Sequence, residues 1–283
     1  MESRHRLHAH CGRRHPDSAV ARGSLRLSAY LLVALLCAPV LAFAQAGPPF
    51  FTNDPGTPGN ANWEINIASA QSIGRNGAAY QVPQIDLNYG LGDRIQLTYE
   101  IPYVLQTSPG QPSQTGWSNA FPGLKWRFYD AGEGGWQLSL FPQMQANAPS
   151  SSLQKGIAGP GSRFLLPFEV TKRLGPVDVD FEAGYYFPKH GESERILGLV
   201  IGRSMTERLD IGVELYNDRA SGGSPNETTL DLGGRFKLSR GLVALFMAGR
   251  SVSGTANGQP EFVGYFGIQI LLSDYGRSLA KEP

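Results

Sequence analysis

Apolar and polar residues alternate along much of this sequence, and the alternation limits the fold more than any other feature. In residues 94–103, RIQLTYEIPY, every second side chain is apolar and most of the others are charged or polar. Successive side chains of a β-strand point to opposite faces, so this pattern predicts a strand with one apolar and one polar face. Similar alternating segments recur along the chain, and three further segments of strand length are apolar on both faces. Twelve strands are predicted, at residues 63–67, 84–91, 94–103, 124–128, 136–144, 164–170, 177–185, 196–202, 209–215, 230–238, 242–249 and 262–272.

The connections between these segments alternate in length. Short links with residues typical of tight turns lie at 92–93, 130–135, 174–175, 205–208 and 239–241. Longer stretches rich in Gly, Pro and Ser lie at 73–79, 106–118, 147–161, 188–193, 217–226 and 252–260. In an up-and-down sheet this order places the short turns at one end and the long loops at the other. Bacterial outer-membrane barrels have that layout, with short periplasmic turns and long outer loops.

A soluble antiparallel sandwich also alternates apolar and polar residues, so the period alone does not decide the fold. Three features favour a membrane barrel: the strands are about ten residues long, their number is even, and no apolar run after residue 44 is long enough for a spanning helix. We therefore predict an all-β, closed antiparallel up-and-down transmembrane barrel over residues 63–272. Aromatic side chains near the strand ends are then expected at the membrane interfaces; in a sandwich they would be rim packing: Trp63, Tyr103, Trp136 and Tyr185.

The first 44 residues are typical of a secretory signal peptide with an unusually long n-region. Arg22 and Arg26 precede an apolar core of about 14 residues, which is shorter than a spanning helix, and Ala42-Phe43-Ala44 forms a small-x-small cleavage site. Cleavage after Ala44 removes six of 25 basic and two of 24 acidic side chains, which leaves a net charge of about −3. That balance argues against nucleic-acid binding. The expected location is the outer membrane, with lipids and the barrel-assembly machinery as partners.

Residues for catalysis or transition-metal binding are scarce in the exported chain. Both cysteines and four of the five histidines lie in the first 44 residues, so His190 is the remaining histidine. Nucleophilic catalysis needs a positioned base beside the nucleophile, and His190 lies in a predicted loop rather than on a lipid-facing wall. We expect no enzyme activity, cofactor or metal. An outer-membrane lipid-modifying enzyme is the less favoured alternative, and carboxylate sites for calcium stay open.

The polar faces of the predicted strands would line a lumen. The predicted lining side chains are Asp86, Arg94, Glu100, Lys125, Arg127, Glu169, Asp180, Glu182, Glu214, Arg235 and Lys237. Opposite charges across a bore can select solutes, or they can pair and seal it. The sequence therefore predicts a channel for small solutes, with a sealed structural or adhesive barrel as the alternative. Residues 45–62 are too rich in Pro, Gly and Asn for a strand, and we expect them to form a periplasmic partial plug that shields Phe50 and Phe51 from water. A tail at 273–283 follows the last predicted strand.

Several short motifs occur in the order and spacing of a known family. They are PPF at 48–50, DP at 54–55, WEIN at 63–66, DLNYG at 86–90, YEIPY at 99–103, GLKWRF at 123–128, FLLP at 164–167 and TERL at 206–209. In these the chain resembles the outer-membrane family named for the meta-pathway of phenol degradation, often called transporter. The resemblance implies a Gram-negative outer-membrane barrel without catalytic residues, linked in some members to aromatic catabolism. It extends the expected solutes to small hydrophobic or aromatic compounds, taken up or exported passively.

Overall fold

The computed structural model describes residues 46–159, 161–189, 192–221, 226–253 and 259–273. The predicted signal peptide, His190 and nearly all of the C-terminal tail lie outside these residues. The described part belongs to one compact unit, Val40–Pro283. No helix among the described residues is long and apolar enough to cross a membrane.

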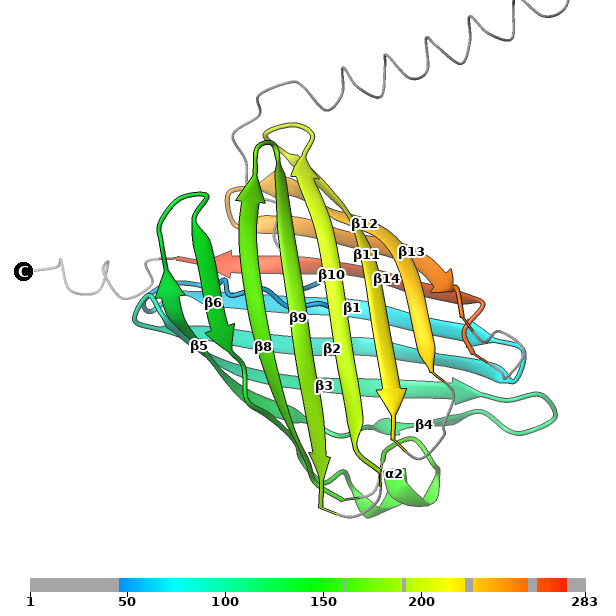
Figure 1. Cartoon of the computed structure of the whole chain (residues 1–283). Helices are drawn as coiled ribbons and strands as arrows, with labels where there is room; N and C mark the ends of the chain where they lie inside the picture. Colours follow the sequence, from blue (N-terminus) through cyan, green and yellow to red (C-terminus); the bar gives the residue numbers. More distant parts are fainter. Residues whose placement is uncertain (1–45, 160, 190–191, 222–225, 254–258, 274–283) are drawn as a thin grey trace, which may run out of the picture. The chain divides into compact units, whose positions relative to one another are not determined.

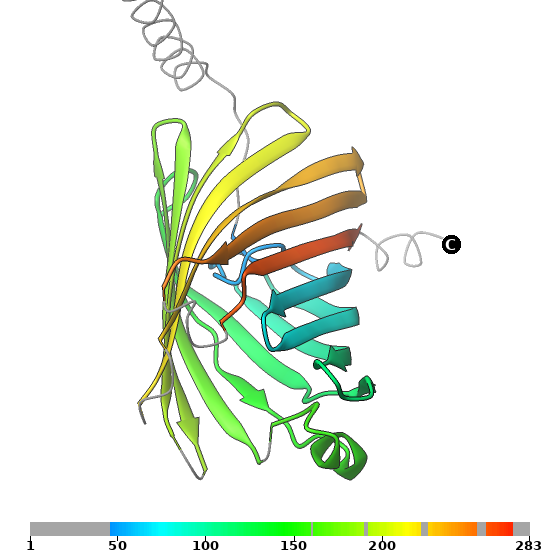
Figure 2. The same ribbon diagram turned by 90° about the vertical axis from the view of Figure 1, so that its right-hand side faces the viewer.

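Fourteen antiparallel strand segments form one closed sheet (Figures 1 and 2). They are β1 (Trp63–Gly74), β2 (Gly77–Leu91), β3 (Ile95–Thr107), β4 (Gln114–Trp117), β5 (Phe121–Asp130), β6 (Trp136–Leu140), β7 (Gln143–Gln145), β8 (Arg163–Leu174), β9 (Val177–Pro188), β10 (Glu194–Ser204), β11 (Leu209–Ala220), β12 (Glu227–Ser239), β13 (Leu242–Ser251) and β14 (Phe262–Leu272). The sheet closes where β1 pairs with β14, in a register that runs from Trp63 opposite Leu272 to Ile73 opposite Phe262.

Two of the barrel's strands are broken into pieces. Both β4 and β5 pair with β3, and both β6 and β7 pair with β5 and β8, so fourteen segments make twelve strands around the barrel. Each remaining strand pairs with its neighbours in chain order, and β1 and β14 pair with each other. The predicted twelve-stranded antiparallel barrel is therefore confirmed.

The prediction of a long connection at 73–79 is wrong. Strand β1 continues to Gly74 and β2 begins at Gly77, so a two-residue turn joins them, with Gly77 at a φ of 139°. The small and polar residues of this region do not alternate with large apolar ones, so the side-chain pattern does not predict the strand ends. The backbone still pairs there, Ser72 with Ala79 and Ile73 with Ala78, because backbone hydrogen bonds depend on no side chain. The other five long connections lie at the end of the barrel that we call the long-loop end; the opposite end is the short-turn end. Two of the five are shorter than predicted, because β4 lies within 106–118 and β11 continues to Ala220.

The largest loop, between β7 and β8, folds back on the break between β4 and β5. It carries the short helix α2 (Ser150–Gln154). The Asn119 side chain donates to the carbonyls of Ala146 and Gly159 at 2.9 and 3.1 Å, and the Ser118 hydroxyl donates to the carbonyl of Ile157 at 3.1 Å. These bonds hold the loop against the barrel wall.

The side chains are distributed in the opposite way to a soluble β-sandwich. Large apolar side chains cover the outside, where Leu232 and Phe266 are 58% and 63% exposed. Carboxylates are fully buried inside, with Glu169 and Glu214 at 0% exposure. Among the predicted interface aromatics, Trp63 and Trp136 begin strands at the short-turn end, whereas Tyr103 and Tyr185 lie in the long-loop halves of β3 and β9. Their role at the membrane interfaces stays a prediction.

Candidate functional site

Residues 46–62, which we call the N-terminal segment, precede β1, and their first part, 46–55, lies in the barrel interior. Figure 2 shows the start of the segment, in blue, between the two walls of the barrel. A turn shapes its deepest part: the Gly47 N–H donates to the Thr52 carbonyl at 2.7 Å, and the Phe50 N–H donates to the Gly47 carbonyl at 2.9 Å. The segment then returns to the short-turn end, where the Thr57 hydroxyl donates to the Asp93 carbonyl at 3.0 Å.

Two carboxylates of the wall accept hydrogen bonds from the backbone of this segment. Glu214 of β11 accepts the N–H groups of Phe51 at 3.1 Å and Thr52 at 2.6 Å. Glu182 of β9 accepts the N–H of Asn53 at 2.8 Å. Hydrogen bonds to charged groups are stronger than neutral ones, and the low dielectric of a buried site strengthens them further. The two glutamates therefore satisfy three backbone donors of a segment that has no sheet partner.

Two cations of the wall bind the carbonyl groups of the same segment. Arg235 of β12 donates to the carbonyls of Ala46 and Pro48 at 2.7 and 2.9 Å. Lys125 of β5 donates to the carbonyl of Asp54. Lys125 also forms an ion pair with Glu169, with 3.4 Å between Nζ and Oε2. Charges of both signs thus hold the segment from β5, β9, β11 and β12.

The wall is also shaped around the segment. A Cβ atom added at Gly198 would lie 2.1 Å from Thr52 Oγ1, and one added at Gly212 would lie 3.0 Å from the Phe50 ring. Phe50 is buried in a small apolar cluster that includes Val200, Met247 and Val263, whereas Phe51 is 42% exposed. The glycines leave room where the segment packs closest to the wall.

The structure brings most of the predicted lumen residues together inside the barrel. Those buried there are Asp86, Lys125, Glu169, Asp180, Glu182, Glu214 and Arg235, and those half-buried are Glu100, Arg127 and Lys237. Arg127 forms an ion pair with Asp130 at 3.4 Å, and Lys237 one with Asp210 at 3.7 Å. Arg94 is exposed in the turn before β3 begins at Ile95, so it lies at the end of the barrel rather than on a strand.

Some interior residues were absent from the sequence prediction. Glu64 and Asn66 alternate with Trp63, Ile65 and Ile67, so the same rule could have identified them. Two interior tyrosines were harder to identify from the sequence. Tyr216 lies one residue beyond a predicted strand end, and Tyr265 lies in a strand that is apolar on both faces.

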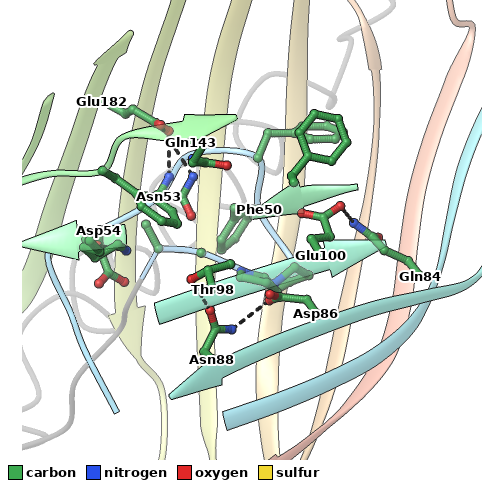
Figure 3. Close-up of a pocket in the computed structure, with 18 of the residues that line it drawn as sticks. Phe50, Asn53, Asp54, Gln84, Asp86, Asn88, Thr98, Glu100, Gln143 and Glu182 are labelled. Carbon is green, nitrogen blue, oxygen red and sulfur yellow. Dashed lines mark hydrogen bonds between the residues drawn. The ribbon is translucent and has the colours of Figure 1, made fainter. Parts of the chain in front are cut away.

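Several cavities remain beside the N-terminal segment; one of about 330 Å³ lies against Asp54, Gly56 and Thr57, and two others share lining residues. The larger of these two, of about 430 Å³, lies between the segment and strands β1–β3. Figure 3 shows Asp86 and Glu100 on the β2–β3 side of this cavity and Glu182 on the opposite side. The smaller, of about 180 Å³, has a mainly apolar and aromatic lining. Phe51, Gln81, Tyr216 and Tyr265 line both cavities. Within the described ranges, no group of three or more His, Cys, Asp or Glu side chains is arranged to hold a metal.

The structure is similar to those of outer-membrane channels. The COG4313 outer membrane channel from Pseudomonas putida F1 matches with a TM-score of 0.59 and 13% sequence identity, over 81% of this chain and 100% of that chain. The KdgM porin matches with a TM-score of 0.53 and 9% identity, over 73% of this chain and 98% of that chain. No family model and no curated protein matches the sequence. The phenol-degradation family therefore stays a prediction, and what the chain shares with these proteins is the fold, a closed antiparallel β-barrel.

Proposed function

We propose that this protein is an outer-membrane channel through which small solutes diffuse passively, and that the N-terminal segment narrows its bore. The single observation that carries this proposal is a polar, charged interior that holds a piece of chain without a sheet partner and about 430 Å³ of unfilled space. A barrel with a purely structural role needs no such space, since protein interiors are otherwise close-packed.

The way the segment is held supports a gate more than a permanent seal. It forms no strand, and its contacts with the wall include hydrogen bonds to Glu182, Glu214, Arg235 and Lys125, whereas its apolar contact is a small cluster around Phe50. Water and ions in an open bore can replace such bonds, and each hydrogen bond to a charged group then contributes a net of only about 1.5–3 kcal/mol. Movement of the segment is therefore compatible with an intact barrel.

The charge of the interior supports a preference for cations. Carboxylates outnumber cations around the larger cavity, where Asp86, Glu100 and Glu182 face Lys125 and Arg235. Both of these cations already donate hydrogen bonds to carbonyl groups of the segment, and Lys125 also forms an ion pair with Glu169. A bore lined mainly by one sign of charge concentrates ions of the opposite sign.

Planar bilayer recordings test the proposal. The purified chain without residues 1–44 should give discrete current steps, and a variant that also lacks 46–57 should give larger ones. Heat-modifiable migration on gels, with folded and boiled samples compared, checks that both barrels are closed. Folded barrels that give no steps with or without residues 46–57 would show that the interior is sealed and would contradict the proposal.

A further inference from the structure

Four pairs of acidic residues lie directly opposite each other on neighbouring strands. They are Asp86 and Glu100, Glu169 and Glu182, Glu214 and Asp231, and Asp218 and Glu227. Like charges directly opposite in an antiparallel pair are destabilising. Each pair therefore needs a compensating partner, or it costs the fold stability.

Two of the buried pairs have such a partner. Lys125 lies 3.4 Å from Glu169, and the N–H of Asn53 binds Glu182. The N–H groups of Phe51 and Thr52 bind Glu214. The N-terminal segment and Lys125 thus balance the acidic pairs on the β8–β9 and β11–β12 side of the interior.

The pair of Asp86 and Glu100 accepts its described hydrogen bonds from side-chain amides alone. Asp86 Oδ2 accepts from Asn66 and Asn88, both at 2.9 Å, and Glu100 Oε1 accepts from Gln84 at 2.6 Å. No Lys or Arg among the described residues forms an ion pair with either carboxylate. Both members of this pair line the larger cavity (Figure 3).

The same wall has acceptor oxygens that lack donors. Asp86 is 9% exposed and its Oδ1 has no hydrogen-bond partner; Asn66 Oδ1 and Gln84 Oε1 also have none. Buried acceptors without donors are costly, and few remain in a native protein. All three are acceptors, and two of the residues that carry them, Asp86 and Gln84, line the larger cavity, so this part of the wall has more acceptors than donors.

The smaller cavity adds aromatic and apolar surface next to this wall. Phe51, Tyr216, Met247, Val263 and Tyr265 line it, and we call it the aromatic chamber. The rings of Phe51 and Tyr216 lie 5.4 Å apart at a tilt of 41°. Carboxylates lie in its lining as well, since Asp218 and Glu227 belong to it. Aromatic faces attract ammonium groups and apolar bodies alike.

We propose that the wall of Asp86 and Glu100, together with the aromatic chamber, forms a binding site for organic ammonium ions with an aromatic or apolar body. The ammonium group donates to the carboxylate pair and relieves its repulsion, and the ring lies against Phe51, Tyr216 and Tyr265. This inference rests on the proposed function in one respect: it names the class of solute that a channel with this interior would slow and select.

Blocking of potassium current in planar bilayers tests the site with phenethylammonium as the probe. Phenylacetate has a similar shape and the opposite charge, and propylammonium has the charge without the ring. For the wild-type channel, phenethylammonium should reach half-block at a concentration at least ~10-fold below that of either other compound, as expected for a charge-assisted contact combined with ring contacts. Equal blocking by phenylacetate, or by propylammonium, would overturn the proposal.

Two variants separate the site from the rest of the acidic interior. The double variant Asp86→Asn/Glu100→Gln keeps the side-chain sizes and should raise the half-blocking concentration about 10-fold or more. The control is Asp231→Asn. Asp231 is a buried carboxylate of another acidic pair and lines neither cavity, so its replacement should leave blocking unchanged. Because the double variant removes a like-charge pair, it should fold at least as well as the wild type, which heat-modifiable migration checks. A folded double variant that is blocked like the wild type would overturn the proposal.

Calorimetric titration of the detergent-solubilised protein with phenethylammonium separates failure of the site from failure of the channel. Binding that Asp86→Asn/Glu100→Gln weakens, in a protein that carries no current, supports the site and contradicts the channel. Current without any preference among the three compounds, and without measurable binding, supports the channel and contradicts the site.

Discussion

Replacing Glu214 by Gln should loosen the N-terminal segment and open the bore. Glu214 accepts two backbone N–H groups, from Thr52 at 2.6 Å and from Phe51 at 3.1 Å, and it is fully buried. Gln has the same size but only one acceptor oxygen and no charge. The variant loses one charge-assisted bond and weakens the other, which destabilises the seated segment by about 1.5–3 kcal/mol.

That loss corresponds to a shift of about 10- to 150-fold toward the unseated segment, since about 1.4 kcal/mol is a factor of ten. Single-channel recording measures the shift as a rise in open probability or in the frequency of large-conductance openings. Asp231→Asn is the matched control: Asp231 lies opposite Glu214 and is equally buried, but its described hydrogen-bond partner is the Thr229 hydroxyl of its own strand. An open probability of Glu214→Gln equal to that of the wild type and of Asp231→Asn would refute the reasoning.

Three further predictions concern the wall, the charges and the outer face. Gly198→Val should displace the segment, because an added Cβ lies 2.1 Å from Thr52 Oγ1, and conductance should rise; unchanged conductance of the folded variant contradicts the close packing. Glu100→Gln should lower the preference for potassium over chloride and Arg127→Ala should raise it, as measured by reversal potentials; no shift in either favours a sealed interior. Leu232→Arg should lower the free energy of unfolding in lipid bilayers by about 2–4 kcal/mol, because this exposed mid-strand side chain would place a charge in hydrocarbon; an unchanged value would mean that this face does not meet lipid.

The alternation of residues predicted the barrel because a closed sheet with an apolar outside and a polar inside imposes a period of two on each strand. The pattern works best in the middle of a strand such as β3, where apolar Leu97 and Tyr99 flank polar Thr98. It fails near the junction of β1 and β2, where small residues such as Ala78 and Ala79 carry no sidedness although their backbones pair fully. The alternation of side chains therefore could not predict where these two strands end and begin.

The candidate site was only partly predictable for a different reason. Alternation assigns Asp86 and Glu100 to the inner face, but their direct opposition depends on the register of β2 and β3, and that register shifts at a bulge between Gln81 and Gln84. The sequence prediction also explained the N-terminal segment by its two phenylalanines. In the structure Phe50 is buried while Phe51 is exposed to the cavities, and much of the binding comes from backbone groups that no side-chain pattern encodes.

The contacts of the N-terminal segment join the start of the described chain to strands made much later. Its hydrogen bonds span 71 residues to Lys125, 129 to Glu182, 162 to Glu214 and 187 or more to Arg235. None of these partners is in place until the later hairpins have formed, and the residues that follow the segment begin β1, which must still find β14. The segment can therefore dock only in a nearly completed cylinder, so its docking marks the end of assembly rather than guiding its beginning.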